Sequence, residues 1–390
     1  MNKKALAIIA ILAVAFCGWY FVGNSSKTKD DGTIRIGYLA ALTGDFAAYG
    51  QAEVNSSQLY IDEINAKGGL FGKKLKLVVY DTKSKPEDAV NAVRRMIQND
   101  GVCAILGTNT SGITLATAPI VNKAQVPQIA TCATNPLVTV DEKGNIRPYS
   151  FRICFIDPYQ GKVAAELAVN DLGTKKAAIL YNVGSDYAQG LREFFIKNYG
   201  ELGGKIVADE GYRDADVDFR AQLTKVKESG AEVIFLPGMG KDMALIIKQA
   251  QELGVKVKVI GGDGYADFMS EIAGNAMKGT YWINHTYLGD PNMKPVFDKY
   301  KEVYKDECKE FTNCTMAYDA TKWLVWAIEK AGKAEGPAIA KELENTKDLK
   351  LTHCTITIDP KDHNIINKPA AILKIADDLK GHFYKAIQPK

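Results

Sequence analysis

Short apolar strands alternate with helices from residue 33 to residue 131, and few residues separate them. The first helix pattern ends at Gly68-Gly69, a typical C-terminal stop, and Pro86 opens the next helix. The predicted strands are 34–39, 75–80, 102–106 and 126–131, and the predicted helices are 48–67, one from residue 86, and 111–123. This alternation predicts a doubly wound parallel β-sheet in the α/β class.

A second α/β unit is predicted to start near Ser150. Its strands are predicted at 177–182, 205–209, 232–236, 257–260 and 278–284, followed by helices at 292–306, 315–331 and 337–346 and β segments at 351–358 and 369–376. A chain of 390 residues is long enough for two such domains. We therefore predict two lobes that direct the carboxyl ends of their strands into a shared cleft.

The N-terminus has the composition of an export signal. Two lysines precede an almost unbroken apolar run over 5–22, and a polar stretch follows over 24–31. Three fates are open: cleavage after the sequence Ala13-Val14-Ala15, acylation at Cys17, or retention of the apolar run as a membrane anchor. Each predicts that residues 32 onward lie outside the cytoplasm, either soluble or tethered.

Seven cysteines occur, and an exported chain can form disulfides. Cys308 and Cys314 are close together in a loop-like segment and form the best candidate pair. Cys103 and Cys154 lie in apolar strand patterns, which are typical of small core residues. No cysteine or histidine spacing of a metal site is present, so we predict no metal site.

Charge and motifs narrow the class of protein. The formal net charge is +3 without a basic stripe, so nucleic acid is a poor candidate partner. An enzyme with Ser111 or Cys132 as nucleophile is the rival to a binding protein. All four histidines come late in the chain, at His285, His353, His363 and His382. None lies in a recognised catalytic motif, so we predict binding without catalysis and without a cofactor.

Two uncharged, hydroxyl-rich segments follow predicted strands, at 107–112 and at 131–136. Ligands of open α/β sheets bind at this carboxyl edge. The first segment opens a helix, whose free N–H groups and Ser111 hydroxyl suit a small anion such as a carboxylate. From the residues alone, a helix cap is the favoured interpretation of Ser111, and Thr134-Asn135-Pro136 is an ordinary turn.

Several segments, in order along the chain, resemble the branched-chain amino-acid-binding branch of the type I periplasmic binding proteins of ABC transporters. They are 36–44, 49–51, 62–69, 133–136, 159–161, 218–219 and 261–264, within a match over about 33–378. The resemblance implies two lobes joined by hinge crossovers, a signal or anchor over 1–31, a permease as partner and a monomer. Lobe 1 would hold 32–153 with 285–368, and lobe 2 would hold 154–284 with 369–390.

The resemblance also implies roles in binding an α-amino-acid head group. Ser111, next to Gly112 at the helix start, matches a serine that holds the ligand carboxylate. Thr134 matches a threonine that bonds the head group, and Cys132 lies where the family offers a backbone carbonyl. Asp263, in a Gly-rich turn, matches the acidic residue that pairs with the ligand ammonium from the second lobe.

Other matching positions would line the pocket. Tyr49, Tyr187 and Tyr159 are aromatic candidates, although tyrosines at such positions often serve packing. Met239 stands where relatives often have a tyrosine, and its flexible side chain would admit a bulkier apolar ligand. A cysteine pair found in some relatives is replaced by Ser84 and Thr110.

The resemblance implies an extracytoplasmic receptor for an amino acid, with a branched-chain or other apolar side chain. A binder of short amides, urea, or small or aromatic carboxylates is the alternative, because one fold hosts many ligands. An extracellular sensor domain is a further alternative. Asp263 favours a ligand with a cationic nitrogen, and Ser111 favours a carboxylate.

Overall fold

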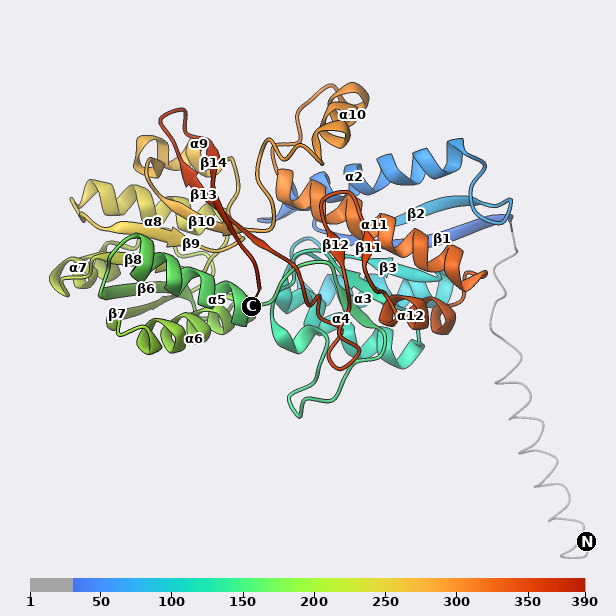
Figure 1. Ribbon diagram of the computed structural model, residues 1–390, viewed down its shortest axis with the longest axis horizontal. Coiled ribbons are helices and arrows are strands. Elements are labelled where there is room, and N and C mark those ends of the chain that lie inside the picture. Colours follow the sequence, from blue (N-terminus) through green and yellow to red (C-terminus); the bar gives the residue numbers. More distant parts are fainter. Residues whose placement is uncertain (1–30, 390) are drawn as a thin grey trace, which may run out of the picture.

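Two separate β-sheets organise the chain in the computed structural model, which describes residues 31–389 (Figure 1). The first sheet has the strand order β2-β1-β3-β4-β5, and all neighbouring strands are parallel. Its strands are β1 (Thr33–Ala40), β2 (Lys74–Asp81), β3 (Ala104–Leu106), β4 (Gln128–Ala130) and β5 (Ser150–Arg152). The order reverses between β1 and β3, which creates a topological switch point at their carboxyl ends.

Helices cover both faces of the first sheet. They are α2 (Ala47–Ala66), α3 (Pro86–Arg95), α4 (Ser111–Ala124), α11 (Phe311–Ala331) and α12 (Gly336–Glu344). One core, which includes Trp323, lies between the sheet and α2, α11 and α12, and a second lies between the sheet and α3 and α4. Ser56 and Ser57 are small enough to bring α2 close to α11, and their hydroxyls donate to the carbonyl oxygens of Cys314 and Ala317.

The second sheet has the order β14-β13-β10-β9-β8-β6-β7. Its strands are β6 (Lys176–Asn182), β7 (Lys205–Tyr212), β8 (Val233–Leu236), β9 (Lys258–Gly261), β10 (Tyr281–Asn284), β13 (Ala370–Ile375) and β14 (Gly381–Ile387). Five of these strands are parallel, while β13 pairs antiparallel with β10 and with β14. The remaining helices are α5 (Asp157–Glu166), α6 (Asp186–Glu201), α7 (Arg220–Glu228), α8 (Gly240–Glu252), α9 (Met269–Ala273) and α10 (Lys294–Tyr304).

The predicted α/β fold with two mainly parallel sheets is confirmed, and the chain passes between the sheets three times. These hinge crossovers come after β5, after β10 and before β13. In Figure 1 they lie together between the two lobes. Because the strand carboxyl ends of both sheets face the space beside these crossovers, loops from both lobes can contact one ligand.

Three details of the prediction were wrong. Ser150–Arg152 was expected to start the second unit but pairs with β4 in the first sheet. Its Phe151 ring stacks on His363 and packs edge-on against Trp323, so segments far along the chain hold it there. The segment predicted at 351–358 is a small hairpin of β11 (Leu349–Lys350) and β12 (Thr355–Ile356), and β14 was not predicted.

The predicted disulfide between Cys308 and Cys314 is confirmed, and it closes the turn that leads into α11. Cys103, Cys132, Cys154 and Cys354 are free thiols. Between residues 31 and 389, no helix has both the length and the apolar character needed to cross a membrane. The predicted export signal or anchor lies, up to residue 30, outside the described residues.

Candidate ligand-binding site

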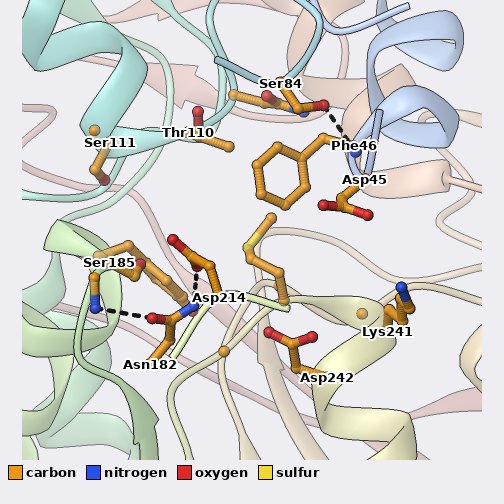
Figure 2. A pocket seen from close by; sticks show the side chains of 18 of the residues that line it. Asp45, Phe46, Ser84, Thr110, Ser111, Asn182, Ser185, Asp214, Lys241 and Asp242 are labelled. Atoms are coloured by element: carbon orange, nitrogen blue, oxygen red, sulfur yellow. Dashed lines mark hydrogen bonds between the residues drawn. The ribbon is translucent and has the colours of Figure 1, made fainter. Parts of the chain in front are cut away.

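A cavity of about 530 Å³ lies between the lobes, and most of its lining comes from loops after strand carboxyl ends. The first sheet contributes the loops after β1, β2, β3 and β4, and the second contributes the loops after β6, β7, β8 and β9. This volume is within the range of small-molecule sites. Figure 2 shows side chains of both lobes directed into this space.

Ser111 is the first residue of α4 and is 1% exposed. Thr110 occupies the N-cap position without a side-chain capping bond, so the interpretation of Ser111 as a simple cap is wrong. The Ser111 Oγ instead accepts a hydrogen bond from the Asn135 backbone N–H at 3.2 Å. The first turn of α4 carries no acidic residue, so its free N–H groups and positive dipole end favour a bound anion.

Asp263 follows β9 in the second lobe, and its side chain is 4% exposed. Its two carboxylate oxygens accept hydrogen bonds from Gln160 Nε2 and His285 Nε2, both at 2.9 Å. Burial lowers the pKa of His285, so the imidazole is neutral near pH 7 and donates through Nε2–H. Two neutral donors therefore orient the carboxylate, and its negative charge remains available to a cationic ligand.

The partners of Asp263 were missed as site residues by reasoning from sequence. Gln160 lies in the recognised segment 159–161, which was a usable signal, and its Oε1 accepts from the Asp263 N–H at 3.2 Å. His285 was considered only as a catalytic candidate. His285 directly follows β10, and the parallel pairing of β10 with β9 brings the His285 and Asp263 side chains together at the carboxyl ends of these strands.

Three predicted aromatic or apolar residues line the cavity: Tyr49, Tyr187 and Met239. The Tyr187 hydroxyl donates to Gln160 Oε1 at 3.4 Å, and Gln160 in turn donates to the Asp263 carboxylate. Met239 is half-buried at the start of α8. Tyr49 extends from α2 in the first lobe to the second lobe, where its hydroxyl donates to the Gly264 carbonyl oxygen at 3.0 Å.

Gly112 and Cys132 also line the cavity. A Cβ at Gly112 would lie 3.1 Å from Asp186 Oδ2 in the other lobe, so the lobes approach closely at this position. Burial raises the pKa of the Cys132 thiol well above its usual range, which disfavours the nucleophilic thiolate. The Asn135 side chain crosses the same gap by donating to the Asp186 carbonyl oxygen at 3.0 Å.

Two predicted site residues lie outside the lining of this cavity. Thr134 is fully buried beneath the loop, and its backbone carbonyl accepts from the Asp157 N–H at 3.0 Å. The Tyr159 hydroxyl donates to the Ile387 carbonyl oxygen at 2.6 Å, and its ring packs edge-on against Phe155. Tyr159 therefore anchors β14 to α5, and the packing interpretation of this tyrosine accounts for its position.

Buried charged residues hold the loop at 131–136 in place. The Arg152 guanidinium is fully buried and donates to the carbonyl oxygens of Ala133 and Asn135 at 2.8 and 2.9 Å. The Glu53 carboxyl accepts from Thr131 Oγ1 at 2.6 Å, and burial raises the pKa of Glu53 to about 7. Sequence reasoning named neither residue, because both sit in ordinary helix or strand patterns.

The structure gives the catalytic alternative no support. None of the four histidines is among the described residues that line the cavity with Ser111 and Cys132. His285 packs against Phe155 at a ring distance of 3.8 Å, and His353 and His382 pair with Asp290 and Asp378. Over residues 31–389, no group of three or more His, Cys, Asp or Glu side chains could hold a metal ion.

Comparisons with known proteins agree with this geometry. A family model described as periplasmic binding protein matches residues 33–380. The Leu/Ile/Val-binding protein homolog 2 of Brucella abortus is 30% identical over 361 residues, which cover 92% of this chain and 93% of the relative.

Two solved structures cover almost the whole described chain. The leucine-binding protein LivK of Thermotoga maritima has a TM-score of 0.84 and 32% identity, and the match covers 91% of this chain and 99% of that one. LivJ of Streptococcus pneumoniae, in complex with isoleucine, has a TM-score of 0.84 and 31% identity, covering 92% and 100%. The chain therefore belongs to the type I periplasmic binding proteins, in the Leu/Ile/Val-binding branch of the solute receptors of ABC transporters.

Proposed function

We propose that this protein is an extracytoplasmic receptor that clamps an α-amino acid between its lobes and delivers it to an ABC permease. One observation carries the proposal. Ser111, at the N-terminus of α4, and the carboxylate of Asp263 line the same cavity from opposite lobes. A zwitterion needs donors at its carboxylate and a negative acceptor at its ammonium, and this pair provides both.

In this proposal, binding of the ligand is coupled to closure of the two lobes. The open state can satisfy only one end of the ligand, because Ser111 and Asp263 belong to different sheets. The closed state contacts both ends, so the ligand favours closure by its differential affinity. We further propose the predicted division into lobes, 32–153 with 285–368 and 154–284 with 369–390, and a monomer as the working unit.

The apolar part of the lining supports a ligand with an aliphatic or aromatic stem. Phe46 and Tyr49 of the first lobe and Met239 of the second belong to one hydrophobic cluster and line the cavity. The proposed ligand contacts are Ser111, Gly112, the Cys132 backbone, Asp263, Tyr49, Tyr187 and Met239. A branched-chain or other apolar amino acid satisfies these contacts.

A thermal-shift screen tests this function. The full chain is screened with α-amino acids, short amides, urea, and aliphatic and aromatic carboxylates at millimolar concentration. We expect at least one α-amino acid to raise the melting temperature by mass action. Asp263→Asn should abolish that shift. The control variant Asp298→Asn should preserve it, because Asp298 is an exposed residue that pairs with Lys294 on α10. A shift with amides or simple carboxylates alone would contradict the proposal.

A further inference from the structure

Asn313 lines the cavity from the first turn of α11 and is 5% exposed. Reasoning from sequence did not single it out, because it lies in the segment between Cys308 and Cys314, which was interpreted only as a loop with a disulfide. The neighbouring Thr312 holds this turn against the end of β10, since its hydroxyl donates to Asn284 Oδ1 at 2.7 Å. The Asn313 side chain is therefore presented to the cavity by a fixed helix start.

Both N–H donors of the Asn313 amide have partners within the protein. Asn313 Nδ2 donates to Glu53 Oε1 at 3.1 Å and contacts Cys132 Sγ at 3.9 Å. Because the Glu53 oxygen accepts, the Nδ2 end of the amide faces Glu53 and the Oδ1 end faces away from it. Asn313 Oδ1 receives no hydrogen bond from residues 31–389, and it keeps accessible surface on the cavity. The free end of this amide is thus an acceptor without a donor.

We propose that Asn313 is a further binding residue whose Oδ1 accepts the third N–H of the ligand ammonium, so that the site selects primary α-amines over N-substituted ones. The inference rests on the proposed function, because Asp263 must hold the same ammonium group. It adds a binding residue and a restriction on the class of ligand.

The number of acceptors supports this assignment. An ammonium group carries three N–H donors and no acceptor. Two of its acceptors are already proposed, the Asp263 carboxylate and the Cys132 backbone carbonyl. Thr134, which the resemblance assigns to the head group, is fully buried beneath the loop and outside the cavity lining. Asn313 Oδ1 provides the third acceptor, and a buried N–H without one would cost free energy.

The surroundings of Cys132 place Asn313 and Asp263 in the same part of the cavity. Asn313 Nδ2 contacts the Cys132 sulfur, as described above. Burial raises the pKa of the Cys132 thiol, and the negative charge of Asp263 adds to this shift, so the carboxylate acts on Cys132 from the second lobe. The hydrogen bond to Glu53 polarises the Asn313 amide and makes Oδ1 a stronger acceptor. Such acceptors repel a carboxylate, which leaves the carboxylate of the ligand to Ser111.

Isothermal titration of the full chain with three ligands tests the inference. They are norleucine, which has a straight four-carbon side chain, N-methylnorleucine, which has one N–H fewer, and hexanoate, which lacks the ammonium group. The wild type should bind N-methylnorleucine at least about tenfold more weakly than norleucine. Asn313→Ala should weaken norleucine binding about tenfold and leave hexanoate binding unchanged.

The same variant should also reduce the penalty for the N-methyl group to less than about threefold, because it has room for the methyl group and no acceptor left to lose. Asn313→Ser is titrated in parallel, so that the comparison does not depend on the folding of one variant. Asn198→Ala is the matched control and should behave as wild type, because the Asn198 amide bonds the Phe194 carbonyl oxygen within α6.

Three results would overturn the role of Asn313. The first is unchanged norleucine binding in the Asn313 variants. The second is an equal loss of norleucine and hexanoate binding, which would mean that Asn313 only supports the loop. The third is the same N-methyl penalty in the variants and the wild type. In each case a wild-type preference for norleucine over hexanoate leaves the proposed function intact. A chain that binds no α-amino acid overturns both.

Discussion

The Tyr49 hydroxyl donates a hydrogen bond to the Gly264 carbonyl oxygen at 3.0 Å, across 215 residues of sequence and between the two lobes. The Tyr49 hydroxyl oxygen also accepts a hydrogen bond from the Gly240 N–H at 3.1 Å, so one side chain of α2 contacts two loops of the second lobe. The ring is 2% exposed and packs edge-on against Phe268. Tyr49 therefore joins the lobes in the arrangement that encloses the cavity.

Tyr49→Phe removes this link and keeps the ring. The Gly240 N–H and Gly264 carbonyl lose their partner only in the closed state, so we expect about tenfold weaker binding of the preferred amino acid. Calorimetry provides the affinity. Tyr80→Phe is the matched control, because the Tyr80 hydroxyl bonds Asp100 within the first lobe. Wild-type affinity in Tyr49→Phe would contradict a role in closure.

Ser111→Ala tests the carboxylate end of the clamp. Loss of the hydroxyl should weaken the binding of amino acids and of their deaminated analogues by a similar factor of about ten, because both kinds of ligand carry the carboxylate. Titration with norleucine and with hexanoate measures the two factors. Ser229→Ala, whose hydroxyl bonds the Val226 carbonyl in the second lobe, should have no effect. A loss confined to norleucine would place Ser111 elsewhere in the site.

We expect the buried carboxyl of Asp157 to make the free energy of unfolding depend on pH. Burial raises the pKa of Asp157 to about 8, and the neighbouring Thr134 hydroxyl opposes this shift only in part. The folded state therefore keeps a proton that the unfolded chain releases above pH 4, and stability falls between about pH 4 and pH 8. The full loss is on the order of 5 kcal/mol.

Asp157→Asn should remove this contribution to the pH dependence. Urea unfolding of the ligand-free protein at pH 5 and at pH 8.5 measures it. We expect the variant to gain stability relative to wild type as pH rises, and Asp298→Asn to follow wild type. Parallel pH profiles of wild type and Asp157→Asn would mean that Asp157 is ionised in the folded protein.

The disulfide between Cys308 and Cys314 spans a sequence separation of six residues. Closing so short a loop in the unfolded chain corresponds to about 2 kcal/mol of stability. Reduction should lower the free energy of unfolding of the wild type by that amount and leave the double variant Cys308→Ser/Cys314→Ser unaffected. The affinity for the ligand should not change, because neither cysteine lines the cavity. A large loss of affinity on reduction would contradict this expectation.

Local patterns were sufficient to predict much of the fold. Strands β1 to β4 and helices α2 to α4 carry their own periodicity and stop signals, so their order could be read directly. Strand β5 could not be assigned this way, because it is three residues long and Trp323 and His363 bury Phe151 from the tail of the chain. Its membership of the first sheet depends on tertiary packing.

The residues of the candidate site also fall into two groups, those that local patterns predict and those whose positions depend on tertiary packing. The positions of Ser111 and Asp263 follow from strand ends, which the sequence marks with a hydroxyl-rich or Gly-rich turn. The contact of His285 with Asp263 depends on the pairing of β10 with β9, and the position of Tyr159 depends on β14.

The central claim is that Asp263 binds the ligand ammonium opposite Ser111. Calorimetric titration of wild type and Asp263→Asn with norleucine and with hexanoate, which lacks only the α-ammonium, tests it most directly. The wild type should prefer norleucine by at least about 100-fold, and Asp263→Asn should reduce this preference to less than about tenfold through weaker norleucine binding. An equal preference for norleucine in both proteins would contradict the account.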